Sequence, residues 1–243
     1  MTHLVLIRHG QTDWNLAGRI QGSSDIPLND TGRQQAREAG RRLAADRWDA
    51  IVSSPLSRAM ETARIIGAEV GIDEITAIPA LVERSYGTAE GMTDTDLDAL
   101  RAEGQQVRGR ETRGEVVRRV RPALIELAES RPDQSILVIS HGGVIGSLVR
   151  DVTKWVWPEE GQRIANGSSH RFAYRDGRIG LVEFNGKPWK SPAGDPDVVL
   201  ELGVPEDQAP IGAEPTDKGP ADVSTPDMST PDMSWVEIDA SQR

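Results

Sequence analysis

The apolar residues of this chain follow two patterns that alternate along the sequence. Three runs of aliphatic side chains are too short for helices and are typical of strands buried in a parallel sheet: residues 4–7, 50–52 and 135–139. Stretches with apolar residues at helical spacing separate these runs: residues 30–44, 55–66, 115–128 and 144–149. Strands that alternate with helices predict an α/β fold, a three-layer sandwich with a mostly parallel central sheet.

The segments between these elements complete the expected fold. We expect an extended segment over residues 75–81, a functional loop over 82–91 and a weakly amphipathic helix with a polar turn over 94–110. Pro122 lies inside an expected helix and predicts a kink or a break there. Residues 169–184 alternate in polarity on both sides of an Asp-Gly pair, which predicts a β-hairpin.

Charge divides the chain into two parts. The 243-residue chain has a formal net charge of −10, and residues 191–243 contain 12 of its 38 acidic residues but only two of its 28 basic ones. The whole net charge therefore belongs to this segment, which also contains eight of the 15 prolines. We expect a catalytic domain over residues 1–190 and an acidic, Pro-rich and mostly disordered tail over 191–243. A domain without a basic excess argues against nucleic acid as a partner.

The composition also limits the chemistry and the location of the protein. The chain has no cysteine, so that neither a disulfide framework nor a thiol nucleophile is available. The N-terminus lacks the pattern of a signal peptide, and no apolar run is long enough to span a membrane. We therefore expect a cytoplasmic monomer or homodimer that has no membrane partner.

Two of the aliphatic runs end in a histidine followed by a glycine. Arg8-His9-Gly10 follows the first run, and His141-Gly142 follows the run over 135–139. Because the carboxyl ends of parallel strands meet at one edge of a sheet, where α/β proteins bind ligands, we expect both histidines at that edge. Arg58 and Glu83 follow two other extended segments. Arginine binds phosphate oxygens and histidine can act as a nucleophile near neutral pH, so these residues predict phosphate chemistry.

The order of these motifs resembles that of the histidine phosphatase superfamily, and specifically of the phosphatase branch of its phosphoglycerate mutase-like proteins. The resemblance covers residues 4–185 and depends on motifs that are weak singly and strong in this order: Leu6-Ile7-Arg8-His9-Gly10, Arg19-Ile20-Gln21-Gly22, Asp25-Ile26-Pro27-Leu28, Ser53-Ser54-Pro55-Leu56-Ser57-Arg58, Leu81-Val82-Glu83, Ser140-His141-Gly142-Gly143 and Asn166. It implies a phosphoglycerate mutase-like fold with a cap over about residues 84–115.

The resemblance also implies a role for each catalytic residue. His9 would attack the phosphorus of a monoester and form a phosphohistidine. Arg8, Arg58 and His141 would surround the non-bridging oxygens, which removes the need for a metal or another cofactor. Glu83 would act as general acid and then as general base, although Glu90 is a nearby competitor. First-loop and helix-start residues are expected to contact the phosphate or the substrate: Gln11, Thr12, Asn15, Gln21, Gly22 and Gly142.

A mutase is the alternative within the family. Residues 83–87 look like the corresponding loop of cofactor-dependent phosphoglycerate mutases, which favours phosphoryl transfer to a second hydroxyl. Residues 83–114, however, lack the longer insertion of those mutases, and a short cap excludes water less well. We therefore expect a hydrolase.

A non-catalytic binding protein and a metal site are the alternatives to this active site. A non-catalytic protein that binds phosphorylated ligands would have no need of the complete set formed by His9, His141, Arg8, Arg58 and Glu83. A metal site is disfavoured, because no close spacing of His, Asp and Glu supports it and the adjacent arginines would repel a cation.

The expected substrate is a small phosphorylated metabolite of the sugar phosphate or phosphoglycerate type. Four arginines cluster in the cap region: Arg101, Arg108, Arg110 and Arg113. They suggest a substrate with a second anionic group beside its phosphate, although solvated surface charge explains them equally well.

Overall fold

The computed structural model of this chain describes residues 1–158 and 162–190. The segment 191–243, for which the sequence predicts disorder, lies outside the described residues. No helix within the described ranges is both long and apolar enough to cross a membrane.

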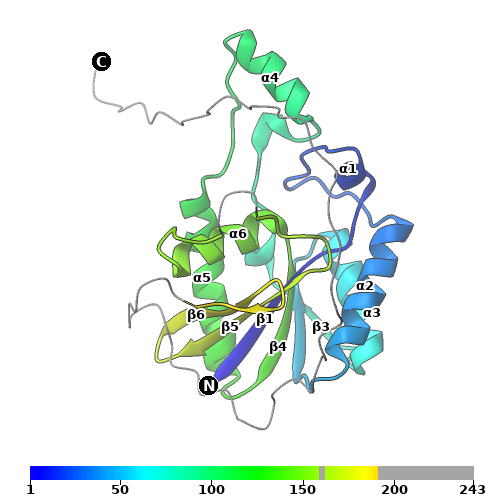
Figure 1. Ribbon diagram of the computed structural model, residues 1–243, viewed down its shortest axis with the longest axis vertical. Helices are drawn as coiled ribbons and strands as arrows, with labels where there is room; N and C mark the ends of the chain where they lie inside the picture. The colour runs from blue at the N-terminus through cyan, green and yellow to red at the C-terminus, as the bar shows by residue number, and fades with distance from the viewer. Residues whose placement is uncertain (159–161, 191–243) are drawn as a thin grey trace, which may run out of the picture. The chain divides into compact units, whose positions relative to one another are not determined.

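A seven-stranded sheet forms the centre of the described part of the chain (Figure 1). Its strands, in spatial order, are β3 (Ile75–Ala77), β2 (Ala50–Ser53), β4 (Ser135–Ser140), β1 (Thr2–Arg8), β5 (Ser169–Arg175), β6 (Arg178–Phe184) and β7 (Lys187–Pro188). The first four run parallel, and the last three continue the sheet with antiparallel pairings. The sheet is therefore mixed, with a parallel half and an antiparallel half.

Helices cover both faces of this sheet, which confirms the three-layer α/β fold (Figure 1). The α-helices of the described residues are α1 (Asp13–Leu16), α2 (Asp30–Leu43), α3 (Ser57–Val70), α4 (Asp94–Ala102), α5 (Arg113–Ser130) and α6 (Gly142–Val152). Helices α2 and α3 pack on one face, and α5 and α6 pack on the other. Residues 82–112, which include α4, extend beyond the carboxyl edge of the sheet (Figure 1).

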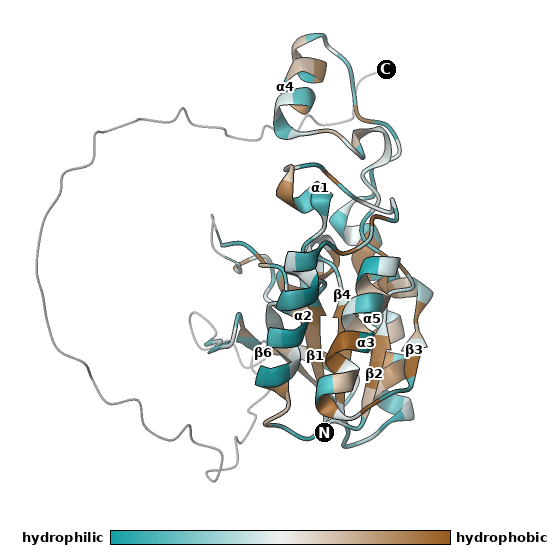
Figure 2. Ribbon diagram, turned by 90° about the vertical axis from the view of Figure 1, so that its right-hand side faces the viewer, coloured by the Kyte–Doolittle hydropathy of each residue, from teal (hydrophilic) through white to brown (hydrophobic). Residues whose placement is uncertain are grey.

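Alternation along the strands explains why the sheet has a core on each side. Leu4 and Leu6 of β1 belong to the core with α5 and α6, whereas Val5 and Ile7 belong to the core with α2 and α3. Side chains of a strand point alternately to opposite faces, so an unbroken aliphatic run is buried on both. Figure 2 shows these strands as the most hydrophobic part of the fold, with hydrophilic residues on the outer sides of the helices.

Local signals set where the helices begin. Asn29 caps α2 by accepting a hydrogen bond from the Gly32 N–H. Thr112 and Glu115 form a capping box at the start of α5. The expected hairpin is also present, and Asp176 and Gly177 in its turn have the positive φ values of 50° and 79° that a tight hairpin requires.

Two local expectations differ from the structure. Helix α5 runs unbroken through Pro122, so the expected break is wrong. Pro122 has no N–H, so the carbonyl of Arg118 loses its helical hydrogen-bond partner. Both residues are exposed, so water can satisfy that carbonyl. The extended segment expected over 75–81 is a strand only as far as Ala77, because Pro79 begins a 3₁₀ turn over Pro79–Leu81.

Candidate active site

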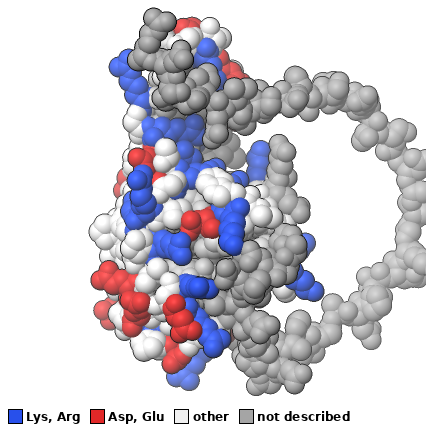
Figure 3. All heavy atoms as spheres, turned by 90° about the vertical axis from the view of Figure 1, so that its left-hand side faces the viewer, with Lys and Arg blue, Asp and Glu red and all other residues white. Residues whose placement is uncertain are grey.

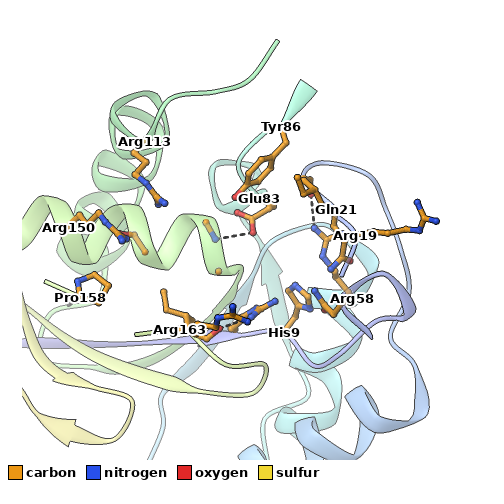
Figure 4. Close-up of a pocket in the computed structure, with 18 of the residues that line it drawn as sticks. His9, Arg19, Gln21, Arg58, Glu83, Tyr86, Arg113, Arg150, Pro158 and Arg163 are labelled. Carbon is orange, nitrogen blue, oxygen red and sulfur yellow. Dashed lines mark hydrogen bonds between the residues drawn. The ribbon is translucent and has the colours of Figure 1, made fainter. Parts of the chain in front are cut away.

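A cavity of about 380 Å³ lies at the carboxyl edge of the parallel half of the sheet. Its lining comes from the ends of β1 and β4 and from the loops and helices that follow the strands. The lining residues are Arg8, His9, Asn15, Arg19, Ile20, Gln21, Gly22, Arg58, Glu83, Tyr86, Arg113, Gly142, Gly143, Gly146, Arg150, Pro158, Gln162, Arg163 and Ile164. Figure 4 shows His9, Arg58 and Glu83 converging from three separate segments.

His9 follows β1 directly and is only 2% exposed. Its Nδ1 lies 2.6 Å from the carbonyl oxygen of Gly10. Because a carbonyl can only accept, Nδ1 carries the proton in the neutral ring, and Nε2 has a free lone pair. Burial lowers the pKa of His9 well below the usual value, and the charges of Arg58 and Arg8 lower it further. His9 is thus a neutral imidazole with an unprotonated nitrogen.

Two arginines, the fully buried Arg58 and the partly buried Arg8, lie beside this imidazole. Arg8 donates from Nη1 to the carbonyl of Ile164, and Arg58 donates to the carbonyls of Ser24 and Gly22. The Nε of each arginine is buried and has no hydrogen-bond partner in residues 1–158 and 162–190. Burial lowers the pKa of both groups, and the carboxylate of Glu83 opposes that effect. Both guanidinium groups are therefore fixed by carbonyls and keep donors for an anion.

His141 is the N-cap residue of α6 and is fully buried. Its ring centroid lies 5.1 Å from that of His9, and its Nε2 lies 2.7 Å from the hydroxyl of Ser54. That hydroxyl also accepts from the N–H of Leu56, so its own proton points to Nε2. Burial lowers the pKa of His141 well below the usual value, with His9 and Arg58 adding to the effect. The neutral ring then carries its proton on Nδ1, which is buried without a partner in the described part of the chain.

Glu83 contributes the carboxylate of the cavity. Its oxygens accept hydrogen bonds from the N–H groups of Gly143, at 3.0 Å, and Val144, at 3.2 Å, in the first turn of α6 (Figure 4). A third bond comes from the N–H of Arg84 at 2.7 Å. These three donors hold the carboxyl group at the start of α6. A Cβ atom at Gly143 would lie 2.5 Å from the Glu83 carboxylate, so glycine is needed for this approach.

The loop that carries Glu83 is braced by Arg119 of α5. Arg119 donates to the carbonyls of Ala80 and Glu83 and forms a two-pronged ion pair with Glu111. Glu111 in turn accepts from the N–H of Ser85. These hydrogen bonds fix the backbone of Glu83 and therefore the position from which its side chain reaches α6.

The six predicted substrate contacts divide into two groups. Four of them line the cavity: Asn15, Gln21, Gly22 and Gly142. Gln11 and Thr12 do not, because their polar groups are bonded to residues of α1 and α2. Gln11 binds Asn29 and Gln35, while Thr12 is fully buried and caps α1.

Two further predictions concern acidic and amide side chains. Glu90, the competitor of Glu83, binds Ser23 and Ser24 instead and is not among the lining residues. Asn166 donates to the carbonyl of His9 and to Asn15. Glu90 and Asn166 therefore hold the loops around the cavity, and Glu83 supplies its carboxylate.

Several lining residues were not predicted from the sequence. Gly143, Gly146 and Arg150 repeat at helical spacing along α6, a signal that could have identified them once Gly142 was placed at the edge of the sheet. Tyr86 and Arg163 had no such signal. Of the four cap arginines only Arg113 lines the cavity.

The described side chains do not form a cluster suited to a metal ion. Among them, no three His, Asp or Glu residues come close enough together to hold a metal ion.

The sequence and the fold are both similar to known phosphatases. Residues 4–187 match the family described as the histidine phosphatase superfamily (branch 1). The chain is 34% identical to a protein of Bacillus subtilis named uncharacterized phosphatase PhoE, over 76% of this chain and 95% of that protein.

Solved structures agree with this match. A mycobacterial glucosyl-3-phosphoglycerate phosphatase superposes with a TM-score of 0.66 at 30% identity, over 75% of this chain and 98% of the other. A phosphoserine phosphatase from Entamoeba histolytica, solved with phosphoserine, superposes with a TM-score of 0.65 at 30% identity, over 76% and 98% of the two chains. The chain therefore belongs to the histidine phosphatase superfamily.

Proposed function

We propose that this protein hydrolyses a small phosphomonoester without a metal, through a phosphohistidine on His9. The observation that carries the proposal is the state of His9 itself. A neutral imidazole whose Nδ1 is bound to Gly10 presents Nε2 as a nucleophile, and the guanidinium groups of Arg8 and Arg58 lie beside it. This combination suits attack on a phosphoryl group, whose charge arginine donors stabilise throughout the transfer.

In the first step the Nε2 lone pair of His9 attacks phosphorus and forms the P–N bond. The ester P–O bond breaks, and the departing oxygen takes a proton from the carboxyl group of Glu83. Arg8 and Arg58, which line the cavity, donate to the non-bridging oxygens. The Nδ1–H of His141 is the third donor, on a ring that lies 5.1 Å from that of His9 but is not itself among the lining residues. Loss of one such donor typically costs about 3 kcal/mol of transition-state stabilisation.

In the second step water replaces the alcohol. Glu83 takes a proton from the attacking water, the P–N bond breaks and inorganic phosphate leaves. The reaction returns His9 to its neutral form and Glu83 to its protonated form. One carboxyl group thus serves as acid and then as base, as the symmetry of the two displacements requires.

The relatives support a small phosphorylated substrate. The similar structures belong to phosphatases named for phosphoserine and for glucosyl-3-phosphoglycerate. Both names denote phosphomonoesters of small metabolites. We extend that class to this chain.

The proposal is tested by trapping the intermediate. We expect ³²P from a labelled phosphomonoester to appear on His9 as an acid-labile, base-stable adduct in the presence of EDTA. His9→Gln should abolish the label and lower kcat by about 10⁴-fold or more, since the nucleophile is lost. His3→Gln is the matched control, because His3 lies in β1, the strand that His9 follows, and is not among the lining residues.

The products separate the proposal from its alternatives. Release of inorganic phosphate at the rate of turnover supports the hydrolase. Transfer of the label to a second hydroxyl with little free phosphate would identify a mutase. A protein that binds phosphomonoesters but is never labelled would be a ligand-binding protein, and the proposal would then be wrong.

A further inference from the structure

The cavity holds more positive charge than a single phosphate requires. Six arginines line it: Arg8, Arg19, Arg58, Arg113, Arg150 and Arg163. Glu83 is the one carboxylate among the described lining residues. Arg8 and Arg58 lie beside His9 and account for the two charges of a phosphomonoester. The face that carries α5 and α6 also gathers Lys and Arg side chains around its middle (Figure 3).

Two of the remaining arginines form a pair. Arg113 is the first residue of α5, and Arg150 lies in the last turn of α6. Their Nη1 atoms lie 3.7 and 3.3 Å from the position of a Cβ atom at Gly146, so both guanidinium groups converge on one point of the cavity wall. Figure 4 shows this pair on the side of the cavity opposite His9 and Arg58, with Glu83 between them.

The two guanidinium groups repel each other, and the described residues provide little compensation. Burial lowers the pKa of Arg113, and the charge of Arg150 lowers it further. No carboxylate in residues 1–158 and 162–190 forms an ion pair with either of them. Arg150 donates only to the carbonyl of Gly146 within those residues. An anion between Arg113 and Arg150 would relieve this repulsion.

Gly146 makes room for such an anion. A side chain at this position would press against Arg150 at 3.3 Å and occupy the wall between the two arginines. Gly146 lies one helical turn before Arg150 and one turn after Gly142, on the face of α6 that lines the cavity. The absence of a side chain there leaves both guanidinium groups open to the cavity.

We propose that Arg113 and Arg150 form a second anion subsite, which selects phosphomonoesters that carry a second anionic group. The inference rests on the proposed function, since it assigns the phosphate to His9, Arg8 and Arg58. The second group is a carboxylate or a second phosphate, which paired arginines bind through the same forked hydrogen bonds. This subsite keeps Arg113 from the hypothesis drawn from the cap arginines. It leaves out Arg101, Arg108 and Arg110, which are not among the lining residues.

The test compares substrates that differ mainly in the group at the far end of a three-carbon chain. Glycerol 3-phosphate has a neutral end, 3-phosphoglycerate has a carboxylate, and propane-1,3-diol bisphosphate has a phosphate. We expect kcat/KM to be about tenfold or more higher for an anionic probe than for glycerol 3-phosphate, the effect of roughly one charge-assisted hydrogen bond. The preferred probe identifies the second group.

Substitutions test whether Arg113 and Arg150 cause the preference for an anionic probe over glycerol 3-phosphate. Arg113→Gln with Arg150→Gln should bring the ratio of kcat/KM values close to one, and Gly146→Val should lower it while both arginines remain. Arg118→Gln is the matched control, because Arg118 lies on the same helix with its side chain 75% exposed. It should preserve the ratio.

p-Nitrophenyl phosphate has no second anionic group, so its hydrolysis tests the proposed function without the subsite. Its hydrolysis also reports whether each variant is folded. A wild-type ratio near one, or a ratio that the double variant leaves unchanged, overturns the subsite even if p-nitrophenyl phosphate is hydrolysed through His9. Absence of all His9-dependent hydrolysis overturns the proposed function instead.

Discussion

His9 depends on its neighbours for the protonation state that the proposed reaction needs. An exposed histidine is partly protonated near neutral pH and then has no lone pair on Nε2. Burial of His9 and the nearby charges of Arg58 and Arg8 lower its pKa, which keeps the ring neutral as the pH falls below the usual histidine range. The arginines proposed to bind the phosphoryl group thus also keep the ring of His9, the proposed nucleophile, neutral.

This dependence predicts the behaviour of Arg58→Gln. Removing the positive charge should raise the pKa of His9, so that the ring becomes protonated at a higher pH than in the wild type. Burial, the larger cause, remains, so the pKa should stay below the usual value. A pH titration of ¹⁵N-labelled histidines by NMR measures the change, with the exposed Arg37→Gln as control. An unchanged or lower pKa in Arg58→Gln would contradict this account.

At the scale of elements, α6 organises the two ends of the cavity. Its N-terminus holds the carboxylate of Glu83 through Gly143 and Val144, and its last turn carries Arg150. The helix begins at this place because β4 ends at Ser140 and His141 serves as the N-cap. The direction of one helix therefore sets the spacing between Glu83, the proposed general acid, and the proposed second anion subsite.

Neighbouring glycines at the start of α6 offer a matched test of Glu83. Gly143→Ala would place a Cβ atom 2.5 Å from the Glu83 carboxylate and displace it, so kcat should fall by about 10²-fold, the range of general acid catalysis. Gly142→Ala meets its nearest atom, Nε of Arg8, at 3.4 Å and should have a small effect. Thermal unfolding checks that both variants are folded. Equal losses of kcat in the two variants would argue against a role for Glu83.

At the scale of the whole molecule, the site draws on both layers of helices. Arg58 comes from α3 on one face of the sheet, and Glu83 is held by α5 and α6 on the other. The sheet between them places His9 and His141 directly after the neighbouring strands β1 and β4. The position of the cavity residues therefore depends on the same packing of helices against the sheet that forms the two cores.

The domain boundary is testable at this scale. Trp189 donates its N–H to Val182 and packs against the core with α5 and α6. A chain ending at Lys190 should keep its unfolding free energy and a kcat/KM within about twofold at physiological salt, where the charge of residues 191–243 is screened. Urea unfolding and steady-state kinetics measure both quantities. A chain ending at Pro188 should be less stable, and a large loss at Lys190 would show that the catalytic domain extends further.

The sequence by itself determined the layers and the ends of the strands. Aliphatic runs can be buried only as central strands, and the carboxyl ends of parallel strands converge, so Arg8, His9 and His141 had to meet at one edge. The roles proposed for these residues, and for Arg58 and Glu83, remain predictions. Local pattern sufficed here because the alternation of side chains and the common direction of parallel strands follow from the backbone.

Only the tertiary structure decided which polar side chains enter the cavity. The Gln11 side chain accepts a hydrogen bond from Asn29 and Thr12 caps α1, whereas Arg113 and Arg150 approach each other from helices that are separated in sequence. Glu83 rather than Glu90 reaches the cavity because α6 begins beside it. The direction of a polar side chain depends on the donors and acceptors that packing brings near it, and these come from distant parts of the chain.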